Sequence, residues 1–135
     1  MIGYGKMSGC AVSALSALAE RHADSIALSS TQIAELRNYS KMTVAKVLTL
    51  LSQAGIVTGS RGPGGGYRLA KSPENIHLID IVRVFESVDD CLRCPFGPNY
   101  CGDNPPCPLH DRLVSLREQY IQELSHCTLA LFVTS

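Results

Sequence analysis

Four cysteines and one histidine lie within a 20-residue stretch of this 135-residue chain, at Cys91, Cys94, Cys101, Cys107 and His110. Four prolines and two glycines lie between Cys91 and Cys107, so no regular helix or strand is expected there. The apolar content of the segment is also too low for burial alone to order it. Thiolates that converge on one metal ion or cluster would supply this order, because metal-binding free energy then becomes folding free energy.

The residue types leave three interpretations of this segment open. Iron-sulfur clusters and zinc both accept cysteine and histidine ligands. Structural zinc sites favour two close cysteine pairs, whereas only Cys91 and Cys94 form such a pair here, which weakens zinc without excluding it. The third interpretation is a metal-free thiol switch. Cys10 and Cys127 lie on apolar helical stripes instead and are expected to be small core residues.

Composition predicts one folded domain. Hydrophobic residues make up 45% of the chain and charged residues 18%, an ordinary globular balance. No apolar run is long enough to span a membrane, and no basic stretch followed by an apolar region opens the sequence. We therefore expect a cytoplasmic protein without membrane contact, in which the cysteines do not form a disulfide framework.

The charges are distributed unevenly along the chain. The formal net charge is zero, but residues 1–72 contain eight basic and three acidic side chains, a balance of +5, and residues 73–135 carry −5. A basic first half suits contact with nucleic-acid phosphates. The alternative is a chance scatter of charges on a solvated surface.

Apolar periodicity predicts a mainly helical chain, with helices over about 8–22, 31–37, 41–54, 78–88 and 108–128. The second is expected to bury Ile33, Ala34 and Leu36. Asn38 suits the left-handed turn after it, and Ser40 can cap the third helix. Two helices joined by so short a turn form a helix-turn-helix, although a plain helical hairpin would look similar.

A glycine-rich hairpin is expected after these helices. Residues 56–60 and 66–69 have the composition of strands, and Arg61, Gly62, Pro63, Gly64 and Gly65 connect them. Such a hairpin is the wing of a winged helix-turn-helix, whose arginine can reach a minor groove. The alternative is a glycine-rich hairpin without a DNA role.

The last two helices have clear apolar faces. The helix over 78–88 is expected to present Ile79, Val82, Val84 and Phe85 to a core. The final helix carries a near-heptad stripe at Leu109, Leu113, Leu116, Tyr120 and Leu124. This stripe suits packing against a symmetry-related copy or, for part of its length, against the first helix.

The chain resembles the Rrf family of winged-helix regulators over nearly its whole length. The resemblance is carried by the wing sequence of residues 60–69 (SRGPGGGYRL) and by the cysteine segment. Residues 43–48, 80–82 and 128–130 also fit the family. The resemblance implies a transcription regulator, most simply a repressor, of the iron-sulfur-binding IscR-like or NsrR-like branch. It divides one regulator domain, residues 1–135, into a winged helix-turn-helix (1–72), a linking helix (73–90), a cluster loop (91–110) and a dimerisation helix (108–128).

The resemblance also implies the ligands. Cys101, Cys107 and His110 keep the spacing of the IscR-like members, and Cys94 takes the first position with one extra residue before Cys101. Cys91 competes with Cys94 for that position, and a four-cysteine site without His110 is the alternative. A [2Fe–2S] cluster is favoured over [4Fe–4S], with zinc as the alternative metal. NsrR-like members use an acidic ligand from the first helix of the partner chain. The corresponding position here falls near Gly9 or Cys10, where there is no carboxylate. Only the Cys10 thiol could reach the partner chain's cluster from there.

The function implied is that of a homodimer on a partly palindromic double-stranded operator, sensing redox state, nitric oxide or iron-sulfur status. The expected contacts of the third helix are Ser40, Lys41, Thr43 and Lys46, and those of the wing are Arg61, Gly62, Gly64, Tyr67 and Arg68. Of the wing arginines, Arg61 and Arg68 are expected to position the wing rather than to read bases. A cysteine-based redox enzyme is disfavoured, because no base is evidently paired with an activated thiol.

Overall fold

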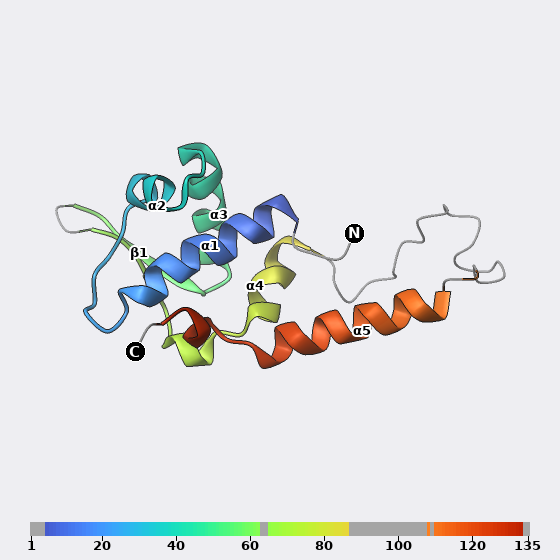
Figure 1. Cartoon of the computed structure of the whole chain (residues 1–135). Coiled ribbons are helices and arrows are strands. Elements are labelled where there is room, and N and C mark those ends of the chain that lie inside the picture. Colours follow the sequence, from blue (N-terminus) through green and yellow to red (C-terminus); the bar gives the residue numbers. More distant parts are fainter. Residues whose placement is uncertain (1–4, 63–64, 87–107, 109, 134–135) are drawn as a thin grey trace.

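The computed structural model of the chain describes residues 5–62, 65–86, 108 and 110–133. Within them the elements follow in the order α1 (Lys6–Glu20), α2 (Ser30–Arg37), α3 (Lys41–Gln53), β1 (Val57–Ser60), β2 (Gly66–Leu69), the 3-10 helix η1 (Pro73–Asn75), α4 (Leu78–Phe85), α5 (His110–His126) and the 3-10 helix η3 (Leu129–Phe132). Figure 1 shows α1 crossing the body of the molecule, α2 and α3 above it, the hairpin extending to one side and α5 projecting to the other. The prediction of a mainly helical fold with a two-stranded wing is confirmed.

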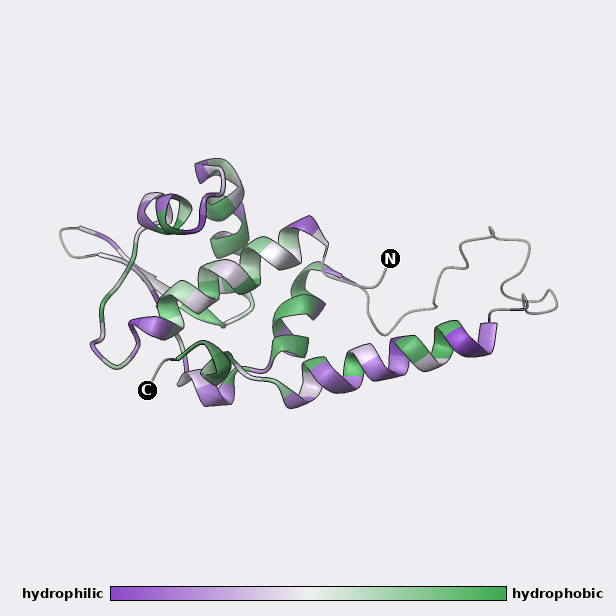
Figure 2. Cartoon of the chain, viewed as in Figure 1, coloured by the Kyte–Doolittle hydropathy of each residue, from purple (hydrophilic) through white to green (hydrophobic). Residues whose placement is uncertain are grey.

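Helix α1 is the centre of the core. It packs against α2, α3, α4, β2 and η3, and ten of its 15 residues are buried. Leu15 and Leu18 are buried on one side of the helix, and Val12 and Ala17 are buried on others. Four alanines allow neighbouring elements to approach the helix closely on several sides. Figure 2 accordingly shows an apolar or neutral ribbon along most of α1.

Local capping signals fix the helix-turn-helix. Ser29 and Gln32 form a reciprocal capping box at the start of α2, with hydrogen bonds of 3.1 and 2.8 Å. Asn38 adopts the predicted left-handed conformation (φ 57°), and Ser40 caps α3. The prediction that Leu36 is buried was wrong, since it is 46% exposed. It lies about 200° around the helix from Ala34, which faces the core.

The wing has the predicted strands and connection. Val57 pairs with Leu69 and Ser60 with Gly66 in antiparallel register. The hairpin joins the body through Tyr67, whose backbone N–H donates to the Leu28 carbonyl at 2.7 Å and whose carbonyl accepts from the Leu28 N–H. Gly66 has a φ of +143°, and a Cβ there would lie 2.7 Å from the Leu28 backbone. Only glycine therefore permits this close approach.

Helix α4 ends at Phe85, before the predicted boundary near 88, and residues 87 and 88 lie outside the described part. Ile79 and Val82 are buried as predicted, whereas Val84 and Phe85 are only partly buried. Leu78 and Ile81 are buried instead. Helix α4 contacts α1, α3 and α5, so these helices cover a wider face of α4 than its apolar pattern indicates.

Helix α5 has its main intramolecular contact with α4 rather than with α1. Its C-terminal end is held firmly, since Leu124 is buried and the Leu78 N–H donates to the Cys127 carbonyl at 2.9 Å. Further along the predicted stripe toward the N-terminus, Leu113 is half-buried and Leu116 is 40% exposed. Among the described residues of the stripe, burial is therefore greatest at the C-terminal end of α5. No helix in the described ranges is long and apolar enough to cross a membrane.

Candidate DNA-binding surface and metal site

Helix α3 separates an inner face from an outer face. Val44, Val47, Leu48 and Leu51 are fully buried against the core. The outer face exposes Lys41, Met42, Lys46 and Thr49. None of these four side chains is covered by another described element, so the N-terminal half of α3 presents two ammonium groups to solvent. This is the part of a recognition helix that approaches base edges in the major groove.

Ser40 and Thr43, two predicted contact residues, bind each other at the start of α3. The Ser40 hydroxyl accepts the Thr43 N–H at 3.1 Å and donates to Thr43 Oγ1 at 2.7 Å. Their first role is therefore to cap the helix. Ser40 remains exposed and Thr43 half-exposed, so both hydroxyls still border the outer face.

The wing residues divide into exposed and anchoring side chains. Arg61 and Gly62 are exposed, and Gly62 has a φ of +91° with open space around it. Arg68 donates from Nε to the Ser25 carbonyl at 2.9 Å, which fixes β2 to the loop after α1. Tyr67 is half-buried against the core, and its ring also covers Gly59. Gly64, a further predicted contact, lies outside the described residues.

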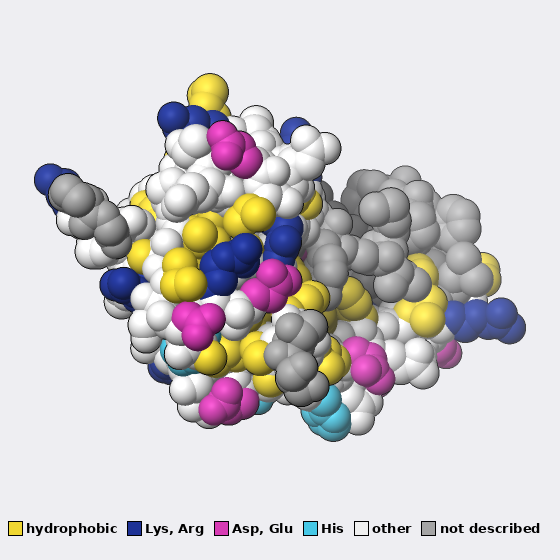
Figure 3. Space-filling model, turned by 60° about the vertical axis from the view of Figure 1, so that its left-hand side comes forward, with side chains coloured by type: hydrophobic (Ala, Val, Ile, Leu, Met, Phe, Trp, Pro, Cys, Tyr) yellow, Lys and Arg dark blue, Asp and Glu magenta, His cyan; other side chains and the backbone are white. Residues whose placement is uncertain are grey.

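Basic side chains occur at both ends of this surface. In Figure 3, Lys and Arg groups lie beside the grey tip of the wing and at the top of the molecule over the helix-turn-helix. Arg37 at the end of α2 is already engaged within the chain, since it donates to the Ser13 carbonyl, Ser16 Oγ and Glu20 Oε1, the last at 2.8 Å. Arg37 thereby orients α2 on α1.

The predicted metal ligands Cys91, Cys94, Cys101 and Cys107 lie outside the described residues. The fifth, His110, is the exposed first residue of α5, so its imidazole is accessible beside that segment. In the described ranges no three potential ligands are grouped for a metal ion. Cys10 has no exposed surface, and burial raises the pKa of its thiol, so the expectation that Cys10 could reach a partner chain was wrong. The prediction that it is a core residue is confirmed.

Comparison with known proteins decides the family. Residues 5–135 match the Rrf2 family, described as iron-dependent transcriptional regulators. The chain belongs to the Rrf2 family. Its members are transcription regulators rather than enzymes, and DNA binding is part of that role.

Solved structures with the same fold are consistent with this assignment. IscR of T. potens superimposes with a TM-score of 0.74 at 24% identity, over 95% of this chain and 83% of that one. CymR of B. subtilis, termed the global cysteine regulator, gives a TM-score of 0.74 at 25% identity over 96% and 95% of the two chains. CymR of Staphylococcus aureus gives 0.75 at 24% identity over 97% and 98%. The winged helix of this Rrf2 protein is thus a known regulator fold.

The structure identifies a residue that the sequence analysis missed, Glu86. Its carboxylate accepts the Gly5 N–H at 3.1 Å and the hydroxyl of Ser8, a fully buried residue, at the N-terminus of α1. Gly5 has no side chain that could cap the helix. The carboxylate of Glu86, 81 residues away in the sequence, therefore accepts a free N–H group and offsets the positive end of the helix dipole. No local sequence pattern could have found it, because Gly5 and Glu86 are 81 positions apart. In the sequence Glu86 directly precedes residues 87–107, so the last described residue before the cysteine segment is bound to α1.

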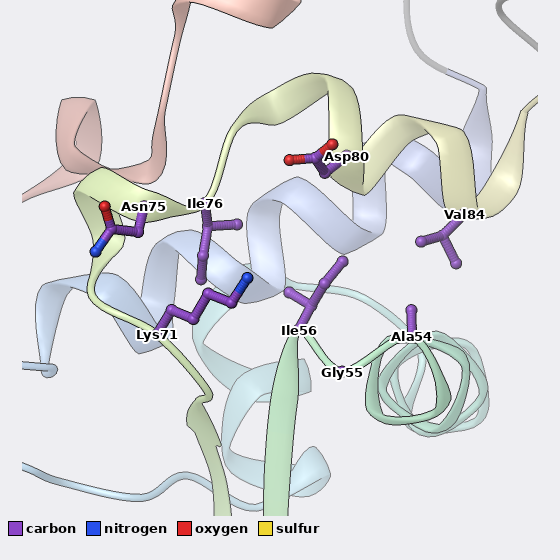
Figure 4. Close-up of a pocket in the computed structure, with 8 residues that line it drawn as sticks. All are labelled: Ala54, Gly55, Ile56, Lys71, Asn75, Ile76, Asp80 and Val84. Carbon is purple, nitrogen blue, oxygen red and sulfur yellow. The ribbon is translucent and has the colours of Figure 1, made fainter.

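A hollow of about 370 Å³ lies at the opposite end of α3 from Ser40 (Figure 4). Ala54, Gly55 and Ile56 form one side of it, and α4 forms the other. Lys71 and Asp80 point into it.

Replacing Glu86 with alanine should lower the free energy of unfolding by about 1 kcal/mol, the usual effect of losing a helix N-cap. Glu86→Gln should lose less, because an amide oxygen still accepts the hydrogen bonds while only the charge is removed. Urea denaturation measures both changes. Glu74→Ala, at an exposed acidic residue, is the matched control and should have little effect. Equal stability of Glu86→Ala and Glu74→Ala would contradict the capping role.

Proposed function

We propose that this Rrf2 protein is a repressor that binds a double-stranded operator through α3 and the wing and senses redox state, nitric oxide or iron-sulfur status through a cluster held by its cysteine segment. The observation that carries the DNA-binding part is the outer face of α3, where Lys41 and Lys46 are exposed on a helix whose other face is fully buried. A rigid helix with a free, cationic N-terminal half suits insertion into a major groove.

The contact residues have distinct roles in this proposal. Lys41 and Lys46 bind phosphates or base edges, while Ser40 and Thr43 hold the helix end and offer their hydroxyls at its border. Arg61 reaches the minor groove or its phosphates from the wing, with Gly62 and Gly64 allowing close approach. Tyr67 and Arg68 contribute indirectly, because their hydrogen bonds to Leu28 and Ser25 hold the hairpin in place.

Arg61→Ala should weaken operator binding about threefold to tenfold and reduce the salt dependence of the affinity by about one counterion. Fluorescence anisotropy with labelled operator at several salt concentrations measures both. Lys71→Ala removes the same charge from the hollow beside α4, just past the end of the hairpin opposite Arg61, and should leave both quantities unchanged. An unaltered affinity and salt slope for Arg61→Ala would mean that the wing does not contact DNA.

The donor set supports the iron-sulfur part of the proposal. Cys94, Cys101 and Cys107 supply three soft thiolates, and His110 or Cys91 supplies the fourth ligand. His110 fits this role because it is exposed at the start of α5, directly after the cysteine segment. When bound, a [2Fe–2S] cluster provides a redox-active group that reacts with oxygen and nitric oxide and orders the segment that ligates it. Zinc on the same residues is the alternative.

Protein purified without oxygen should be coloured and contain iron and acid-labile sulfide in equal amounts, about two of each per chain for a [2Fe–2S] cluster. Cys101→Ser and Cys107→Ser should remove the visible absorption. Cys127→Ser, which alters a cysteine packed against the core, is the control and should retain it. The spectra of His110→Ala and Cys91→Ser then identify the fourth ligand. Colourless protein that holds zinc tightly would contradict the iron-sulfur assignment.

A homodimer completes the proposal. Helix α5 projects beyond the body in Figure 1. Of the stripe residues that the structure describes, Leu124 is buried, Leu113 and Tyr120 are half-buried and Leu116 is 40% exposed. A second copy of α5 is the simplest cover for a near-heptad stripe of this kind. Two chains related in this way would present two α3 helices to the two halves of a palindromic operator.

A further inference from the structure

Met42 is the most exposed of the large apolar side chains in the described residues, at 84% of its full accessible surface. It occupies the second position of α3, between Lys41 and Thr43. An isolated exposed apolar side chain on a protein surface is ordinary by itself. The position of Met42 on α3 is what calls for an explanation.

Met42 belongs to the outer face of α3 and to no part of its core face. Lys46 follows it by four residues and Thr49 by seven, so the three share one side of the helix. The core residues Val44, Val47 and Leu48 all lie away from that side and are fully buried. Met42 therefore lies at the N-terminal end of the α3 face that would enter the major groove in the proposed function.

The chemistry of base edges indicates what such a side chain can contact. In the major groove, thymine offers its C5-methyl group, which is the main apolar feature that distinguishes one base pair from another there. A thioether side chain donates no hydrogen bond, is flexible and polarisable, and packs well against a methyl group. Lysine at 41 and 46 can bind phosphates or guanine but offers no such contact.

We propose that Met42 is a specificity-determining residue that reads a thymine methyl group in each half-site of the operator. This inference rests on the proposed function, because it assumes that α3 enters the major groove. Neighbouring Lys41 and Lys46 supply affinity for the backbone, and Met42 adds a preference for thymine over the other bases at one position. The preference comes from burying a methyl group that uracil lacks.

The test begins with an operator selected from a random double-stranded DNA library by the full-length protein. Each thymine of the selected sequence is then replaced singly by uracil, which removes only the C5-methyl group. The unsubstituted protein should lose about fourfold in affinity at one position per half-site, the effect of one buried methyl. Met42→Ala should bind the thymine operator more weakly and should bind the thymine and uracil forms of that position equally.

Lys41→Ala is the matched control. It should weaken binding to every operator form and keep the full preference for thymine over uracil. Because Met42 is exposed, Met42→Ala should unfold at the same urea concentration as the unsubstituted protein. A thymine preference that persists in Met42→Ala, or the absence of any methyl-sensitive position, would overturn the inference while leaving operator binding intact. A selection that enriches no sequence would instead overturn the proposed function.

Discussion

The burial of α1 on nearly every side is the constraint on which the rest of the structure depends. Ten of its 15 residues are buried, and many are small enough for α2, α3, α4, β2 and η3 to pack closely around it. Arg37 orients α2 on its second half, and Glu86 caps its first turn. The helix-turn-helix, and Glu86 as the last described residue before the cysteine segment, are thus attached to one helix.

This arrangement suggests how a signal could reach the operator in the proposed function. In the sequence, residues 87–107 lie between Glu86, which caps α1, and α5, so a cluster bound by this segment would act on the α1 cap through Glu86 and also on α5. Through α1, cluster binding would alter how α2 and α3 pack against α1 within one chain. The α5 route would alter the distance between the recognition helices of two chains. Either route requires two alternative arrangements with different affinity for DNA.

Short-range signals in the sequence were sufficient for the helix-turn-helix. Ser40 as a cap and Asn38 in the left-handed turn each act within a few residues, so the sequence alone predicts them. The need for glycine at Gly66 comes instead from the Leu28 backbone, which is distant in the sequence. Exposure of Leu36 and burial of Ile81 depend on which distant elements cover a helix face. The Glu86 cap and the Arg68 anchor join residues 81 and 43 positions apart, beyond any local pattern. For the metal site, the residue types indicate cysteine ligation of an iron-sulfur cluster or zinc. Which of Cys91 and Cys94 is a ligand depends on side-chain positions outside the described part.

The most direct test of this account is the affinity of the full-length protein for its selected operator, measured without oxygen before and after the iron is removed by a chelator. If the cysteine segment is coupled to the DNA-binding surface, the two dissociation constants should differ at least about fivefold, a coupling free energy of about 1 kcal/mol. Equal dissociation constants for the iron-loaded and iron-free protein would contradict the claim that this segment controls DNA binding.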